Sequence, residues 1–244
     1  MVNRRVGTTV VCGCRTGAHE ALAVDAAGNS EVVASLPSFP SCIDFLGDGR
    51  LPMVSANDGR LLRREPDGLL TTYADLSGLA DHPWNEVVVD GRDNAYVNNI
   101  GFDFPNGEPA PGTIALVTPD GAARQVAGGL WFPNGMAVTP DNATLLVAVS
   151  HAHKLTAFDV AANGSLLHRR SWTELGDGVP DGICAWMPMA RSGTATSPTS
   201  ARCAYAREAW CSTRSSSTAA ASPAHWAVPT GAPCSWSPPN GRPP

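Results

Sequence analysis

The sequence has little positive charge, no long apolar run and almost no helical periodicity. Only one of its 17 basic residues is a lysine, and the net charge is -5. Because no basic cluster is present, neither a nucleic acid nor an anionic membrane surface is predicted as a partner. No run of about 18 apolar residues occurs, so the sequence predicts no membrane-spanning helix.

The N-terminus and the cysteines give no sign of an oxidising compartment. Residues 1–17 contain an arginine pair but only a short apolar run, so no signal peptide is predicted. The seven cysteines are irregularly spaced, and Cys12 and Cys14 are followed by no second pair at the spacing of a zinc site. We therefore expect a cytoplasmic protein with reduced thiols.

Short apolar runs that end in Asp, Asn and Gly turns fill the middle of the chain. Examples are LGDGR at 46–50, TPDGA at 118–122 and TPDNA at 139–143. Such turns favour β-hairpins, because Asn, Asp and Gly tolerate a positive φ. They recur about every 20 residues, and two hairpins per unit give a period of about 40, the spacing of β-propeller blades. The pattern predicts an all-β fold with radial repetition, with a two-sheet sandwich as the alternative.

Residues 185–244 have a different composition. They contain 13 Ala, 10 Ser and 9 Pro, a single Val, and no Leu, Ile or Phe. A strand needs β-branched and aromatic residues on its buried face, so regular strands are not predicted here. The composition is typical of a disordered extension, although four tryptophans are unusual for one.

Four stretches of the chain carry a family resemblance: PSFPSCIDFLGDGRL (37–51), DHPWNEVVVDGRDNAYVNNIGFDF (81–104), LWFPNGMAVTPDNATLLVA (130–148) and GVPDGIC (178–184). In this combination and order they resemble the regucalcin-like family of senescence-marker proteins, gluconolactonases and luciferin-regenerating enzymes. The resemblance implies a six-bladed β-propeller, of which residues 20–184 encode about four blades. The segments 1–19 and 185–244 are expected to be irregular, since neither contains the family's pattern.

Codon arithmetic suggests a reason for the irregular ends. When the last base of each codon is read with the first two of the next, Trp186–Met187 gives Asp and Met187–Pro188 gives Ala. In the same way Met189–Ala190 gives Gly, whichever synonymous codons are used. The product is Asp-Ala-x-Gly, the turn that the family has at this place. We therefore hypothesise that residues 1–19 and 185–244 are translated out of frame.

The resemblance also implies a site at one mouth of the propeller. Asn134 and Asp181 match metal ligands, and Asp181 also matches the proposed general base. Asn85 matches a polar residue that contacts metal or substrate, and Asn99 is expected to have a minor role in binding substrate. Amide and carboxylate oxygens suit a hard divalent metal, with Ca²⁺ as the first choice and Zn²⁺, Mn²⁺ or Mg²⁺ as alternatives. Asn-Gly and Asp-Gly are also ordinary turn pairs.

Two departures from the family bear on activity. The family's N-terminal glutamate has no equivalent, because Glu20 lies too far along the chain, and Val149 stands where many relatives have an acidic residue. Asn98 and Asn99 lead into a Pro/Gly-rich loop from Gly101 to Gly112, a candidate rim lid.

The expected function is metal-dependent hydrolysis of a small-molecule lactone, a sugar lactone as in gluconolactonases, impaired in this chain by the missing glutamate. No protein partner is predicted. The alternative from another class is a non-catalytic calcium-binding or interaction propeller, and a third is a chain without function. His151 and His153 could ligate a metal from one face of a strand, but exposure at a blade edge is the simpler interpretation.

Overall fold

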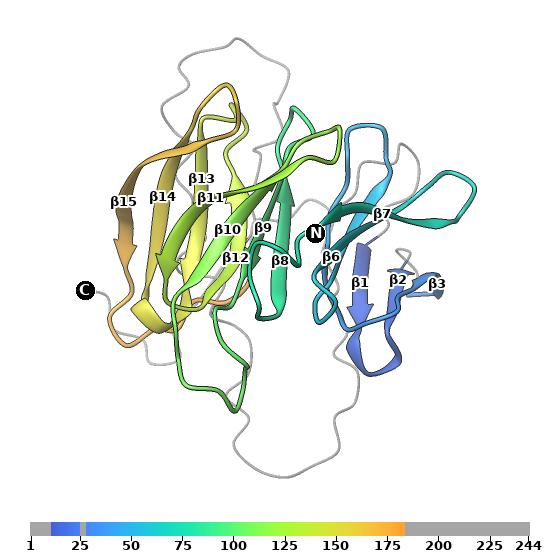
Figure 1. The fold of residues 1–244 in the computed structure, drawn as a ribbon, viewed down its shortest axis with the longest axis horizontal. Helices are drawn as coiled ribbons and strands as arrows, with labels where there is room; N and C mark the ends of the chain where they lie inside the picture. Colours follow the sequence, from blue (N-terminus) through green and yellow to red (C-terminus); the bar gives the residue numbers. More distant parts are fainter. Residues whose placement is uncertain (1–10, 25–27, 184–244) are drawn as a thin grey trace, which may run out of the picture. The chain divides into compact units, whose positions relative to one another are not determined.

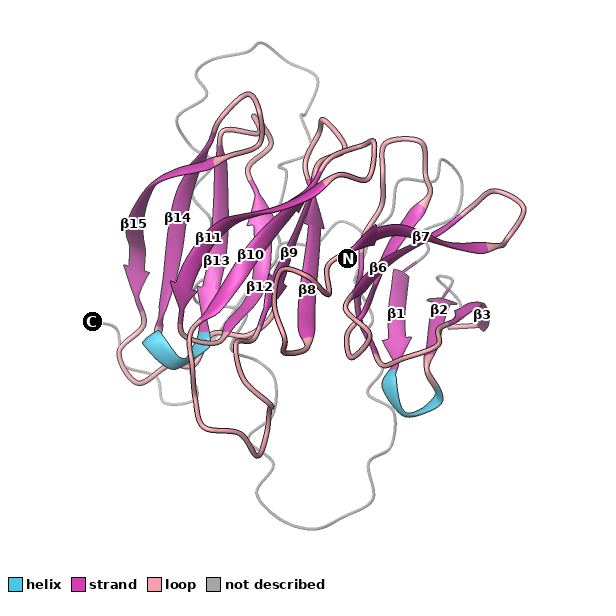
Figure 2. Ribbon diagram, in the orientation of Figure 1, coloured by secondary structure: helices cyan, strands magenta, loops and turns pink. Residues whose placement is uncertain are grey.

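The computed structural model describes residues 11–24 and 28–183, and the predicted tail 185–244 lies outside them. Within these ranges the only helical segments are two 3₁₀ turns, η1 (Thr16–Ala18) and η2 (Ser150–Ala152). The prediction of an all-β fold is confirmed (Figure 2). No helix among the described residues is long and apolar enough to cross a membrane.

The strands of the described residues form four antiparallel sheets, and each sheet follows chain order (Figure 1). The first holds β1 (Val11–Arg15), β2 (Glu20–Val24) and β3 (Ser30–Ser35). The second holds β4 (Pro40–Ile43), β5 (Leu51–Ser55), β6 (Arg60–Arg64) and β7 (Leu70–Asp75). The third holds β8 (Trp84–Val89), β9 (Ala95–Asn99), β10 (Gly112–Val117) and β11 (Ala123–Leu130). The fourth holds β12 (Pro133–Val138), β13 (Thr144–Val149), β14 (Lys154–Val160) and β15 (Leu166–Glu174).

This topology is propeller-like, since successive four-stranded meanders are the unit of that architecture and a sandwich would need two facing sheets. One expectation differs. The segment 1–19 was predicted to be irregular, yet β1 pairs with β2 from Val11↔Val24 to Arg15↔Glu20. Val11 favours extended backbone, and the regular pairing with β2 completes the strand whatever the origin of this segment in the gene.

The core lies between neighbouring sheets, and the third sheet contributes to two separate apolar clusters. Along β9, Val97 packs with the second sheet, whereas Tyr96 packs with the fourth. Along β10, Ala115 likewise packs with the second sheet and Ile114 with the fourth. Because successive side chains of a strand point to opposite faces, this alternation means that both faces of the third sheet are covered. Every residue of β9 is therefore buried.

The turns at one end of the sheets lie where the sequence predicts them. In the turn before β11, Gly121 N donates to Thr118 O at 2.8 Å, and Asp120 accepts a hydrogen bond from the Thr118 hydroxyl. Gly121 has φ +86°, and a Cβ there would lie 2.6 Å from Tyr73 O, so only glycine fits. Asn142 takes a positive φ in the turn between β12 and β13 of the fourth sheet, at the same end of the sheets.

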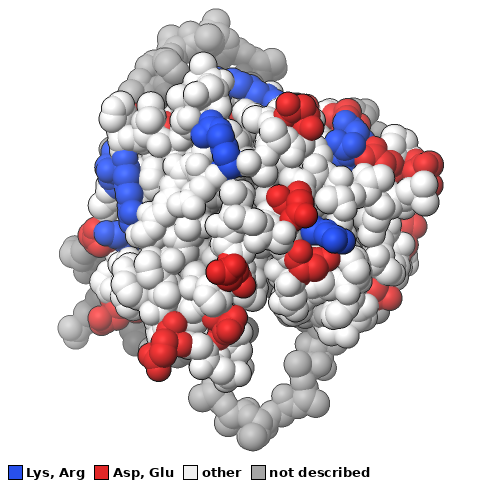
Figure 3. All heavy atoms as spheres, viewed as in Figure 1, with Lys and Arg blue, Asp and Glu red and all other residues white. Residues whose placement is uncertain are grey.

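The opposite end carries the loops that precede β4, β8 and β12. In an antiparallel meander, the loop after the second strand of each sheet also lies at this end. β8 contacts β4 on one side and β12 on the other, which brings the starts of these three strands together. Over the described part of the face in Figure 3, acidic and basic side chains are scattered and form no extended basic patch, in keeping with the charge analysis.

Candidate functional site

The first strands of the second, third and fourth sheets each contain a β-bulge near their start. In each bulge, two residues of the first strand oppose one residue of the second: Ser41 and Cys42 in β4, Asn85 and Glu86 in β8, Asn134 and Gly135 in β12. The flanking pairs are Pro40↔Ser55 and Ile43↔Met53, Trp84↔Asn99 and Val87↔Val97, and Pro133↔Val149 and Met136↔Val147. Bulges re-aim side chains and are common beside active sites.

The bulges give two of the predicted site residues equivalent positions. Asn85 and Asn134 are each the first residue of a bulge, with Ser41 as their counterpart in the second sheet. Asp181 follows Pro180 as Asn134 follows Pro133. The sequence signal for this equivalence is a proline directly before the site residue, as in Pro40–Ser41, Pro133–Asn134 and Pro180–Asp181.

Asn98 joins the bulges of β8 and β12. It is 0% exposed and lies opposite the β8 bulge. Its Oδ1 accepts a hydrogen bond from Glu86 N at 3.1 Å, and its Nδ2 donates to Asn134 O at 2.6 Å. Bulge residues lose their ladder partners, so this one amide replaces two of the lost backbone hydrogen bonds. Asn98 therefore fixes the spacing between the strand that carries Asn85 and the strand that carries Asn134.

The segment that leads to Asp181 is tied to the fourth sheet near Asn134. Gly135 N donates to Asp181 O at 3.2 Å, and the Ser150 hydroxyl donates to Pro180 O at 2.6 Å. His153 Nδ1 lies 3.0 Å from Gly178 O. A Cβ at Gly135 would lie 2.3 Å from Ile183 N, so glycine is what allows this approach. The two predicted metal ligands thus come together through their backbones.

Asn99 differs from the other predicted site residues. Its side chain is 1% exposed, and its Nδ2 donates to the carbonyl oxygens of His82 and Pro83. The amide therefore holds the turn that leads into β8 and does not offer its protons to a ligand. Asn99 therefore supports the start of β8, the strand that carries Asn85.

Two half-buried acids, Asp44 and Glu86, and the buried Cys42 thiol lie where β4 meets β8. Burial is the main cause that raises the pKa of Glu86 from 4.5 to about 7, and the nearby Asp181 charge raises it further. Burial likewise raises the pKa of the Cys42 thiol well above its usual range and that of Asp44 to about 6. Cys42 Sγ lies 3.6 Å from Val87 O, and Asp44 Oδ2 accepts from Val89 N at 2.7 Å. Cys42 and Asp44 therefore provide hydrogen-bond partners for backbone groups on the edge of β8.

The oxygen atoms of Asn85, Asn134 and Asp181 are the kind of ligand that a hard cation prefers, but together they carry only one negative charge. Asn85 and Asn134 are half-buried and Asp181 is exposed. Hard cations take oxygen ligands from carboxylates and amides, which these three residues supply. No group of three or more His, Cys, Asp or Glu residues that could hold a metal occurs in residues 11–24 and 28–183. Asp181 is then the one carboxylate of the set, and a bound cation would be held weakly.

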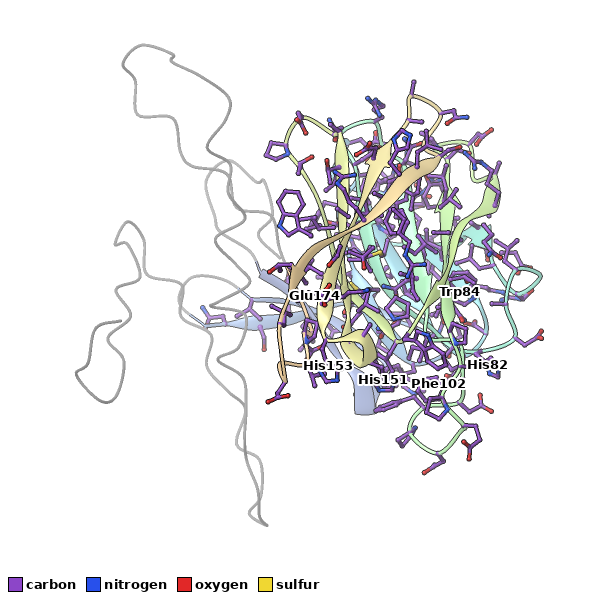
Figure 4. The ribbon with its side chains drawn as sticks, turned by 90° about the vertical axis from the view of Figure 1, so that its left-hand side faces the viewer. His82, Trp84, Phe102, His151, His153 and Glu174 are labelled. Carbon is purple, nitrogen blue, oxygen red and sulfur yellow. The ribbon has the colours of Figure 1, made fainter. Side chains whose placement is uncertain are left out.

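The two histidines weighed as ligands have other contacts. The His151 ring lies 4.8 Å from the Phe132 ring, centroid to centroid, and His151 is exposed at the end of the fourth sheet. His153 contacts Gly178 O through Nδ1. Figure 4 shows His82, Phe102, His151 and His153 in a row at one end of the described sheets.

The fold and the bulge residues define a propeller-like β-protein with polar oxygen donors at the end where its first strands begin. Residues 17–185 match the family model for the SMP-30/gluconolactonase/LRE-like region. Since the match spans most of the chain, the chain belongs to the SMP-30/gluconolactonase/LRE-like family. The resemblance inferred from the sequence is confirmed.

Solved structures of low sequence identity share the fold. A gluconolactonase from Xanthomonas campestris has 23% identity and a TM-score of 0.59, with 73% of this chain and 62% of that chain covered. The calcium-binding protein regucalcin from Agrobacterium tumefaciens has 19% identity and a TM-score of 0.60, with 73% and 60% covered. A luciferin-regenerating enzyme has 15% identity and a TM-score of 0.59, with 72% and 61% covered. The chain thus spans about three fifths of the length of these structures. No curated protein sequence matches.

Proposed function

We propose that this chain derives from a metal-dependent lactone hydrolase whose site lies at the bulges of β8 and β12 and at Asp181. The observation that supports this most directly is the contact between Gly135 N and Asp181 O, which brings Asn134 and Asp181 together. Family membership supports the same reaction class, because the family includes gluconolactonases. A sugar lactone is the reference substrate, and a cytoplasmic location is part of the proposal.

The residues divide the work by their chemistry. Asn134 and Asp181 would hold the cation, and a bound cation would supply polarisation of the lactone carbonyl. Asp181 accepts the proton of the attacking water, since an exposed carboxylate beside the reacting carbonyl can act as a general base. Asn85 hydrogen-bonds the substrate from the neighbouring bulge. Asn98 keeps the two bulges in register and touches no substrate.

The proposal includes the hypothesis that residues 1–19 and 185–244 are out of frame. The restored chain gains the family's N-terminal glutamate, a second carboxylate for the cation. Resequencing the gene across codons 15–25 and 180–190 tests the hypothesis directly. An unambiguous reading of the present frame in the genome and the transcript would contradict it.

A paired assay tests the function. The present chain and the frame-restored chain are compared for hydrolysis of δ-gluconolactone with Ca²⁺, Zn²⁺ or Mn²⁺ added. We expect turnover in the restored chain and little or none in the present one. Replacing Asp181 with Asn in the restored chain should abolish turnover and keep the circular dichroism spectrum unchanged.

The second candidate function is a non-catalytic calcium-binding or interaction propeller. It is supported by the donor set itself, which has a single carboxylate and would bind a cation without strong activation of water. A restored chain that folds, binds Ca²⁺ and hydrolyses no lactone would favour this alternative.

A further inference from the structure

Aromatic side chains from three loops gather around Phe132, two residues before Asn134. Phe102 and Phe104 come from the loop between β9 and β10, Phe132 from the link between β11 and β12, and His151 from η2. Ring centroids are 5.1 Å apart for Phe104 and Phe132, and 5.8 Å for Phe102 and Phe132. The Phe132 and His151 rings are 4.8 Å apart. We call these four residues the aromatic wall, two members of which, Phe102 and His151, are labelled in Figure 4.

The aromatic wall has a buried base and an exposed tip. Phe102 is 4% exposed and anchors the cluster, whereas Phe104 is 57% exposed. Trp131, next to Phe132, is 46% exposed, and Val179, two residues before Asp181, is 54% exposed. Large apolar side chains that gather on a surface beside a polar site are typical of a ligand-binding face.

The backbone holds the wall against the site. Phe132 has φ +57°, a left-handed conformation that a bulky side chain seldom adopts, and it directly precedes Pro133 and Asn134. The conformation is fixed from η2, because Ser150 N donates to Phe132 O at 3.0 Å and His151 N donates to Trp131 O at 3.2 Å. Strain that the surroundings maintain in this way is common at ligand-binding positions. It places the Phe132 ring two residues from a proposed ligand of the cation.

We propose that the aromatic wall binds an aromatic ring on the substrate, so that the site takes aryl lactones in preference to unsubstituted sugar lactones. This inference rests on the proposed function for its reacting group. An aryl ring can stack edge-to-face on Phe104 and Phe132 in the way those two rings, at 81°, already pack on each other. A sugar lactone carries hydroxyl groups that need hydrogen-bond partners, and among the four wall residues the His151 ring alone offers polar atoms.

The test separates binding from turnover by using lactams, which resist hydrolysis. Binding of 3,4-dihydro-2-quinolinone and of gluconolactam to the full chain is measured by titration calorimetry with Ca²⁺ present. We expect the aryl lactam to bind more tightly. Phe104→Ala should weaken it about tenfold, the scale for losing an apolar contact in a pocket, and leave gluconolactam unchanged. Trp172→Ala is the matched control, since Trp172 is 43% exposed on the outer strand β15.

The outcomes distinguish this inference from the proposed function. Equal binding of both lactams, or loss of both in Phe104→Ala with an unchanged melting temperature, overturns the inference. Phe132→Leu keeps apolar volume but removes the ring, so it is a second variant that is expected to fold. It should also weaken binding of the aryl lactam and leave binding of gluconolactam unchanged. If the aryl lactam binds through Phe104 while the frame-restored chain hydrolyses neither dihydrocoumarin nor δ-gluconolactone, the inference stands and the proposed function fails.

Discussion

At the residue scale, the arrangement of the proposed site depends on the buried side-chain amide of Asn98. Asn98 satisfies Glu86 N and Asn134 O, which the bulges would otherwise leave without partners. The sequence shows an Asn-Asn pair before a loop, and either residue could have been the one that faces a substrate. The structure gives both of them mainly supporting contacts, with Asn98 between two strands and Asn99 behind a turn.

Replacing Asn98 with Ala should lower the free energy of unfolding by about 2–4 kcal/mol, since each buried backbone group left unpaired costs about 1–3 kcal/mol. Urea denaturation checks this. Asn98→Asp keeps an acceptor for Glu86 N but cannot donate to Asn134 O, so it should fall short of the wild-type value as well. Asn57→Ala, at an exposed position, is the control and should change little. Wild-type stability in Asn98→Ala would refute the bridging role.

Glu86 should make the stability fall as pH rises. The folded protein keeps the Glu86 proton up to about pH 7, whereas the unfolded chain loses it near 4.5. Between these values the folded state binds more protons, so its free energy of unfolding decreases with pH and then levels off. Asp44, with a pKa of about 6, adds the same trend at lower pH.

The variant Glu86→Gln isolates that contribution. Between pH 5 and 8, the free energy of unfolding of this variant should fall by roughly 2–3 kcal/mol less than that of the wild type, because each unit of pKa shift is worth about 1.4 kcal/mol. Urea denaturation at several pH values measures it. The titratable side chains near Glu86, which are Cys42, Asp44 and Asp181, are unchanged in this variant. A pH profile equal to wild type would show that Glu86 is ionised in the fold.

At the scale of the element, the bulged first strands explain how much the sequence could predict. The turns, the all-β class and the family stretches follow from local composition, because Asn, Asp and Gly are favoured by turn geometry itself. The bulges do not follow, since they depend on which residue of β8 pairs with which residue of β9. The tie from Asn98 to Asn134 joins residues 36 positions apart, and the aromatic wall joins three loops. No local pattern encodes such contacts.

Gly135→Ala should separate Asp181 from Asn134. The added Cβ would lie 2.3 Å from Ile183 N and 2.7 Å from Asp181 O, so the 181–183 segment must shift. We expect faster hydrogen exchange at the Gly135-position amide, which donates to Asp181 O, and weaker metal binding. Gly78→Ala is the control, because nothing lies within 4 Å of a Cβ there. Unchanged exchange in Gly135→Ala would contradict the contact.

At the scale of the whole molecule, the number of carboxylates limits metal affinity. The described donors include one carboxylate, so titration calorimetry with Ca²⁺ should give a dissociation constant of about 1 mM or weaker, the range of sites with few charged ligands. Asp181→Asn should abolish what binding remains. The frame-restored chain should bind at least tenfold more tightly. Micromolar binding by the present chain would show that the donor set is larger than proposed.

The recurrence of one bulge in three sheets makes the site modular. Ser41 occupies in the second sheet the position that Asn85 and Asn134 occupy in the third and fourth, although its hydroxyl donates to Trp84 O at 3.3 Å. An Asp or Glu substituted at position 41 would have the same backbone geometry as Asn85 and Asn134, because a bulge sets the direction in which its side chain points. Ser41 is therefore a position at which a second carboxylate ligand for the cation can be introduced by substitution, without restoring the reading frame of the terminal segments.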